Sequence, residues 1–210
     1  MKRFILVMCT FCFILIACEK GTTPQIIDTS VLIPLKLGNS WVYKEIDYWN
    51  PVATTSQFSL TVDSAVQFQG ETHYKMRITD IQTDETMIID AYFINKADGH
   101  HFIYIPEDGE PDVTLFKYPT FDGEIISEDE YFKFYVESVN AEYTTPAGKF
   151  KCIKYVSIVT IDGKEYEKTI NYIAPGIGRI ADETYDKSPN LEDAPWNLTS
   201  ISTLMSYKLK

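Results

Sequence analysis

The chain is short of the residue types on which many functional classes depend. Its 210 residues include only four cysteines, three histidines, ten glycines and ten prolines. So little glycine and proline excludes a fibrous protein, and a hydrophobic content of 45% excludes a disordered one. Basic residues number 19 against 30 acidic ones, which argues against nucleic acid as a partner, because phosphate binding needs clustered Lys and Arg.

Short catalytic motifs are missing as well. The chain has no Gly-x-Ser-x-Gly, no P-loop, no His-Glu-x-x-His, and no Cys-x-x-Cys beyond residue 18. Gly176-Ile177-Gly178 lacks the third glycine and the following helix of a dinucleotide-binding loop. These absences argue against an enzyme, and we predict no catalytic residue, no cofactor and no metal ion.

Long hydrophobic runs are confined to the start of the chain. Met1-Lys2-Arg3 precedes an uncharged run over 4–17, the pattern of a secretory signal peptide. The run is too short to span a bilayer comfortably, and no later segment is long and apolar enough to do so.

The apolar run ends in Leu15-Ile16-Ala17-Cys18, which resembles a bacterial lipobox. The resemblance implies removal of residues 1–17 and attachment of diacylglycerol to Cys18, which would anchor the protein stably. An ordinary signal peptide that contains a cysteine is the alternative. Glu19 is not the usual inner-membrane retention residue, so we expect the outer membrane, facing the periplasm, with exposure at the cell surface as the alternative. We predict a tether over 18–32 and one β domain over 33–210.

Aromatic residues are plentiful, at 14 Tyr, 12 Phe and 3 Trp, and such residues favour strands. Over 57–68 apolar and polar residues alternate, as in a strand with one buried face. A short helical turn is the only helix that we expect, over 188–197. The other expected strands, which bring the number to about ten, are 41–49, 74–79, 86–94, 101–105, 131–139, 149–161, 165–173, 176–185 and 200–209.

Turn sequences between these segments indicate hairpins, as at Asp98-Gly99 and Asp162-Gly163. Ten strands in a flat open sheet would expose both edges and one apolar face. We therefore predict an all-β fold in which antiparallel strands, in chain order, form a strongly curved sheet or partly open barrel. A two-layer β-sandwich is the alternative.

Three short segments, 34–43, 145–150 and 172–178, together resemble a group of uncharacterised lipid-anchored or secreted bacterial β proteins. The resemblance brings no biochemical function with it. The expected curved sheet also resembles, by architecture alone, the periplasmic lipoprotein carriers that hold acyl chains in an apolar concavity. From the residues themselves we expect structural roles in turns and core for Gly38, Asn39, Trp41, Tyr43, Pro146, Gly148, Phe150, Pro175, Gly176 and Gly178.

The candidate chemical groups have simpler structural explanations. His100 and His101 are adjacent on a strand, so they point to opposite faces and do not suit one metal ion. Cys152 has no histidine near it in sequence and is expected to be a small buried side chain. The acidic clusters 107–112 and 127–130 lack calcium-loop spacing and are expected to be solvated loops.

The sequence favours a non-enzymatic envelope lipoprotein that binds a hydrophobic ligand or an envelope partner through a curved β surface. This function predicts an apolar concave cavity. The first alternative is an accessory subunit of an envelope complex, with a filled core and an exposed apolar patch. The second is a hydrolase of envelope polymers, with two facing carboxylates in a cleft.

Overall fold

Thirteen antiparallel strands make up the regular secondary structure of the computed structural model, which describes residues 28–48, 52–104, 113–187 and 194–210. These described residues contain no helix, and the predicted all-β class is confirmed. The strands are β1 (Ser40–Asp47), β2 (Thr54–Phe68), β3 (Glu71–Asp80), β4 (Thr86–Ile88), β5 (Tyr92–Lys96), β6 (Gly99–Ile103), β7 (Val113–Lys117), β8 (Ile125–Glu128), β9 (Phe132–Thr145), β10 (Gly148–Ile161), β11 (Lys164–Ala174), β12 (Gly178–Asp186) and β13 (Asn197–Lys208).

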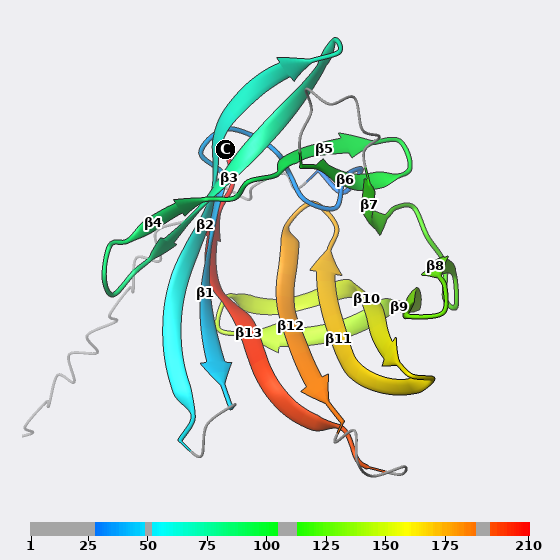
Figure 1. Ribbon diagram of the computed structural model, residues 1–210. Coiled ribbons are helices and arrows are strands. Elements are labelled where there is room, and N and C mark those ends of the chain that lie inside the picture. Colours follow the sequence, from blue (N-terminus) through cyan, green and yellow to red (C-terminus); the bar gives the residue numbers. More distant parts are fainter. Residues whose placement is uncertain (1–27, 49–51, 105–112, 188–193) are drawn as a thin grey trace, which may run out of the picture.

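All the strands belong to one sheet, in the order β7-β6-β5-β3-β2-β1-β13-β12-β11-β10-β9-β8, and β4 pairs with β3 beside this path. The first and last strands of the chain are therefore hydrogen-bonded neighbours. The two ends of the sheet, β7 and β8, follow one another in the chain. The sheet curls so that it nearly closes, with its opening in the middle of the sequence (Figure 1). This confirms the strongly curved sheet and not the β-sandwich.

The hairpin of β9 and β10 supplies a second layer. Register shifts around Cys152 and Lys154 interrupt the ladder between these strands, and bulges of this kind bend a sheet. The far half of the hairpin passes behind β12 and β13 (Figure 1). There the rings of Tyr143 and Tyr172 lie 4.4 Å apart, and Phe150 packs edge-on against Tyr207. The hairpin thus covers the convex side of the sheet and leaves the concave side open.

Four strands differ from the expectation. Segment 86–94 is not one strand: β4 pairs with residues 77–79 of β3, while the ladder between β5 and the same strand is confined to Tyr74 and Phe93. Strands β7 and β8 were not expected, because five and four residues are too few to establish an alternation. Residues 188–193 of the expected helical turn over 188–197 lie outside the described residues. Its last residue, Asn197, is the first residue of β13.

Two clusters of buried side chains form the core, one around Trp41, Tyr43 and Ile180 and the other around Val136 and Tyr155. Leu32, from the expected tether, is buried in the second cluster. Among the described residues there is no helix with the length and hydropathy needed to cross a membrane.

The first and third sequence motifs meet in the core. Trp41 Nε1 donates a hydrogen bond of 2.6 Å to the Ile177 carbonyl, and Tyr43 donates one of 2.9 Å to the Arg179 carbonyl. Gly178 has φ +108°, and a Cβ atom there would lie 3.5 Å from Trp41 Nε1. The tight turn of Pro175 and Gly176 thereby presents its backbone to the two aromatic side chains of β1.

Asn39 and the second motif complete this end of the fold. The Asn39 amide donates to the Pro34 carbonyl and its oxygen accepts from the Lys210 backbone N–H, so one side chain ties the entry of β1 to the end of the chain. Gly38, with φ +79°, makes the preceding turn. Pro146 and Gly148 lie in the β9–β10 turn, and Phe150 joins the cluster of Trp41. The motif residues therefore have places in turns and core.

Candidate functional site: a cavity in the concave sheet

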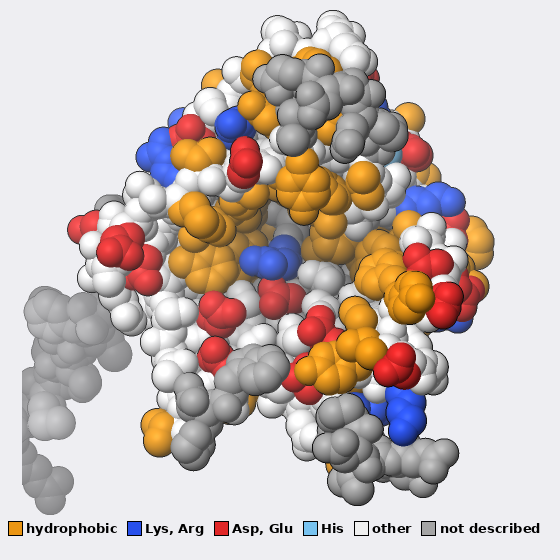
Figure 2. Space-filling view, viewed as in Figure 1, with side chains coloured by type: hydrophobic (Ala, Val, Ile, Leu, Met, Phe, Trp, Pro, Cys, Tyr) orange, Lys and Arg blue, Asp and Glu red, His pale blue; other side chains and the backbone are white. Residues whose placement is uncertain are grey.

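The concave side of the sheet encloses a cavity of about 930 Å³, which opens at the surface (Figure 2). Residues of β1, β2, β3 and β5 to β12 contribute to its walls, so it lies inside the curl of the sheet. Protein interiors rarely contain voids much larger than a water molecule, and small-molecule sites span roughly 300–1,000 Å³. The cavity therefore has the size of a ligand site and not of a packing defect.

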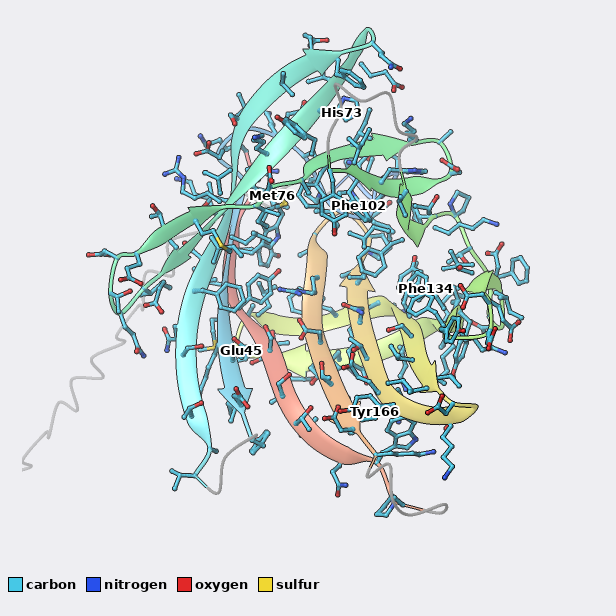
Figure 3. The ribbon with its side chains drawn as sticks, in the orientation of Figure 1. Glu45, His73, Met76, Phe102, Phe134 and Tyr166 are labelled. Carbon is cyan, nitrogen blue, oxygen red and sulfur yellow. The ribbon has the colours of Figure 1, made fainter. Side chains whose placement is uncertain are left out.

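One half of the cavity is lined by apolar side chains. In Figure 3, Met76, Phe102 and Phe134 surround the opening from above and from the right. Hydrophobic surface also predominates around this part of the hollow in Figure 2. We call this region the apolar half and define it by Phe58, Leu60, Met76, Phe102, Leu115 and Phe134.

The other half is polar, as the strand register shows. Asn171 of β11 lines the cavity. It begins a row of directly paired residues that crosses four neighbouring strands: Asn171, Asp182 of β12, Ser202 of β13 and Glu45 of β1. Directly paired residues point to the same face of a sheet, so this row faces the cavity. Ser157 lines the cavity one row further down. We call these five residues, Glu45, Ser157, Asn171, Asp182 and Ser202, the polar half. Ser157 and Asn171 line the cavity itself, whereas the other three lie beside it on the same concave face of the sheet.

Arg179 lies where the two halves meet. Its guanidinium group is 2.9 Å from Asp182 Oδ1 and 4.9 Å from the centroid of the Tyr43 ring. Of its side-chain surface 32% is accessible, and Arg179 lines the cavity. Desolvation alone would lower the pKa of Arg179, but the pKa is raised, because Asp182, Tyr43 and Glu45 favour the charged form. The cation is therefore permanent and already neutralised by a carboxylate.

Burial also governs the groups around this arginine. Desolvation raises the pKa of Asp182, and Arg179 opposes that rise. Desolvation likewise raises the pKa of the Tyr43 hydroxyl to about 12, so Tyr43 stays neutral and serves as a hydrogen-bond donor. On the opposite wall, Lys117 pairs with Glu124, and the hydrogen bond from Lys117 is the main cause of the lowered pKa of Glu124.

His100 lines the cavity as a neutral side chain. Its ring stacks on Phe93 at 5.7 Å, and Nδ1 lies 2.9 Å from Asn95 Oδ1. An amide oxygen can only accept, so Nδ1 carries the proton. Burial, with a further contribution from His101, lowers the pKa of His100 to about 3.

This neutral histidine makes stability depend on pH. The unfolded chain takes up a proton near pH 6.5, whereas folded His100 resists protonation down to about pH 3. The free energy of unfolding should therefore fall with decreasing pH in this window, by up to roughly 1.4 kcal/mol per pH unit. We expect His100→Gln to flatten the dependence measured by urea unfolding between neutral pH and about pH 4. Parallel curves for wild type and variant would contradict this.

The remaining candidate groups have structural places. His101 bonds Asp98 through Nε2, at 2.9 Å. Cys152 is buried, and desolvation raises the pKa of its thiol to about 11, so it is protonated at neutral pH. Asp129 accepts hydrogen bonds from the backbone of residues 131 and 132, which shapes a turn. Segment 107–112 lies outside the described residues, and across the described part of the chain no three His, Cys, Asp or Glu side chains group as metal ligands.

Sequence reasoning missed the charged residues of the cavity, although a signal was present. Every second residue of β1 faces inward, and these are Trp41, Tyr43, Glu45 and Asp47 in order. The inward face thus changes from aromatic to acidic along one strand. Glu45 and Asp182 lie on one face of the sheet with β13 between them, and Asp182 pairs with Arg179.

Comparisons with known proteins support the fold. A family described as DUF3108-like matches residues 136–194. A Bacteroides fragilis structure, described provisionally as an exported protein with a YmcC-like fold, gives a TM-score of 0.52 at 17% identity, over 86% of this chain and 100% of that one. A Parabacteroides distasonis structure, described provisionally as a lipoprotein, gives a TM-score of 0.45 at 18% identity over the same shares. No curated protein matches the chain. The first of these structures supports the curved all-β fold, and the three-motif pattern stays a prediction.

Proposed function

We propose that this protein is a non-enzymatic binding protein of the bacterial cell envelope, which holds a hydrophobic or amphiphilic molecule inside its curved sheet. The observation that carries the proposal is the cavity of about 930 Å³ with its apolar half. A well-packed protein interior contains no void of this volume. While the cavity is empty, its lining side chains lack many of the dispersion contacts that a packed core provides. A ligand with an apolar part would restore those contacts.

The envelope location rests on the start of the chain and on the structural neighbours. The sequence 15–18 resembles a lipobox, and the two solved structures are described as an exported protein and a lipoprotein. We infer that residues 1–17 are removed, that Cys18 carries the lipid, and that the segment up to residue 32 links the anchor to the β domain. Attachment to the outer membrane, facing the periplasm, is the form that we favour.

Native mass spectrometry tests ligand binding directly. Residues 20–210 would be exported to a bacterial periplasm without the anchor, purified without detergent, and weighed before and after organic extraction. We expect an excess mass that extraction removes and that lipid analysis identifies. A clean monomer mass would contradict a tightly held ligand and would favour an accessory subunit, whose partner crosslinking of the anchored form would identify.

A matched pair of variants ties the ligand to the cavity. Leu115→Trp adds bulk to the apolar half, whereas Leu37→Trp makes the same change at a side chain that is 47% exposed and does not line the cavity. We expect at least a roughly tenfold loss of bound lipid in the first variant, which corresponds to about 1.4 kcal/mol, and none in the second. Equal retention in both variants would place the ligand elsewhere.

A further inference from the structure

We infer that the cavity selects the head group of its ligand, and that it takes an amphiphile with a cationic amine head and not one with a phosphate or carboxylate head. The inference rests on the proposed function. The apolar part of the ligand would lie in the apolar half, and its amine would lie along Glu45 and Asp182 in the polar half.

The positive charges of the cavity are already paired. Among the described residues that line it, the cationic side chains are Lys117 and Arg179. Lys117 pairs with Glu124, and Arg179 lies 2.9 Å from Asp182. The third basic side chain, His100, is neutral. An anionic head would have to displace a carboxylate from one of these cations, so the cavity offers it no free partner.

Negative charge exceeds positive charge in the polar half. Glu45 joins Asp182 there against the single charge of Arg179. Two more carboxylates, those of Asp186 and Glu167, face inward near the end of β12 and pair with each other across the ladder. Glu167 also pairs with Val159, whose other neighbour is Phe132 of the cavity wall. Acidic surface gathers along the lower side of the hollow in Figure 2, and Figure 3 places Glu45 at its lower left.

Two buried polar atoms in this region also lack a hydrogen-bond partner among the described residues. Ser202, which lies between Glu45 and Asp182, is only 3% exposed, and its hydroxyl makes no hydrogen bond. Asp186 Oδ1 is in the same condition. An unsatisfied buried polar atom costs free energy, and a ligand head that donates hydrogen bonds would remove that cost. Ammonium groups donate three hydrogen bonds and accept none, so they fit a row of carboxylates and hydroxyls.

Three probes with the same dodecyl chain test this selection: dodecylammonium, dodecyl sulfate and dodecyl maltoside. Their binding to delipidated residues 20–210 would be measured by calorimetry, below the micellar concentration and at low and moderate salt. We expect dodecylammonium to bind at least about tenfold more tightly than dodecyl sulfate. Glu45→Gln should remove most of this difference.

Asp182→Asn gives a reversal that general acidity would not produce. The substitution leaves the Arg179 cation without its carboxylate, so dodecyl sulfate should gain about tenfold in affinity. Glu142→Gln is the matched control, because it removes one negative charge at a 54% exposed side chain that does not line the cavity. We expect the control to bind all three probes as the wild type does.

The outcomes separate this inference from the proposed function. If dodecylammonium and dodecyl sulfate bind equally well, or if Glu142→Gln changes their ratio as much as Glu45→Gln does, the amine preference is overturned and the apolar site remains. If none of the three probes binds, the cavity does not take an acyl chain, and both proposals are overturned together.

Discussion

Replacement of Trp41 by alanine is expected to lower the free energy of unfolding by about 4 kcal/mol. The side chain is 1% exposed and belongs to the larger core cluster, so truncation removes many contacts and enlarges the neighbouring cavity. It also leaves the buried Ile177 carbonyl without the hydrogen bond from Nε1. Small domains are stable by only about 5–15 kcal/mol, so the loss is a large part of the total.

Urea unfolding of the wild type and three variants would measure the effect. Trp41→Phe keeps most of the ring and removes only the donor, so it should cost about 1–2 kcal/mol. Phe121→Ala removes an aromatic side chain that is 62% exposed and should change stability by less than about 0.5 kcal/mol. If the free energy of unfolding of Trp41→Ala stayed within about 1 kcal/mol of the wild-type value, the contact between β1 and the Gly176–Gly178 turn would not be a main source of stability.

Replacement of Cys18 by serine is expected to release the full-length protein from membranes. Serine cannot form the thioether, and without acyl chains nothing else in the proposal holds the protein at the bilayer. The membrane-bound fraction, measured by quantitative blotting of pelleted and soluble material, should fall by more than about tenfold. Labelling with a radioactive or alkynyl fatty acid should be lost at the same time.

Cys9→Ser is the matched control for this change, because it alters a cysteine within the segment that we expect to be removed. The control should stay in the membrane pellet and keep its fatty-acid label. If the intact Cys18→Ser chain still pellets, and does so after the control has behaved as expected, attachment through a protein partner must replace the lipid anchor.

The alternation of side chains was enough to predict the class of the fold and most of its strands. Segment 57–68 lies within β2, and 149–161 and 165–173 lie within β10 and β11, because long strands carry several repeats of the pattern. Short strands carry too few repeats of the pattern, so β7 and β8 were not predicted. The pairing of β1 with β13 follows from how the whole sheet curls, which no local pattern records.

The residues of the candidate site were harder to predict from the sequence than the fold. An apolar cavity was expected of a curved sheet, but its charged residues were not identified. Glu45 and Arg179 lie on different strands, and the charge excess appears only after the register has brought the strands together. The histidines drew attention because histidine often does chemistry, whereas burial keeps His100 neutral and stacked on Phe93.

The circular order of the strands has a consequence for how the chain could be rearranged. Lys210 bonds Asn39, 171 residues earlier, so the two ends of the folded domain are already neighbours. Linking them and opening the chain between β7 and β8 would give a permuted protein in which every strand except β4 follows its neighbour in space. The pairing that now closes the longest loop would become a local hairpin, and a lower contact order should speed folding. The natural chain instead pairs its most distant strands, β1 and β13, and leaves the two ends of the sheet at β7 and β8, in the middle of the sequence.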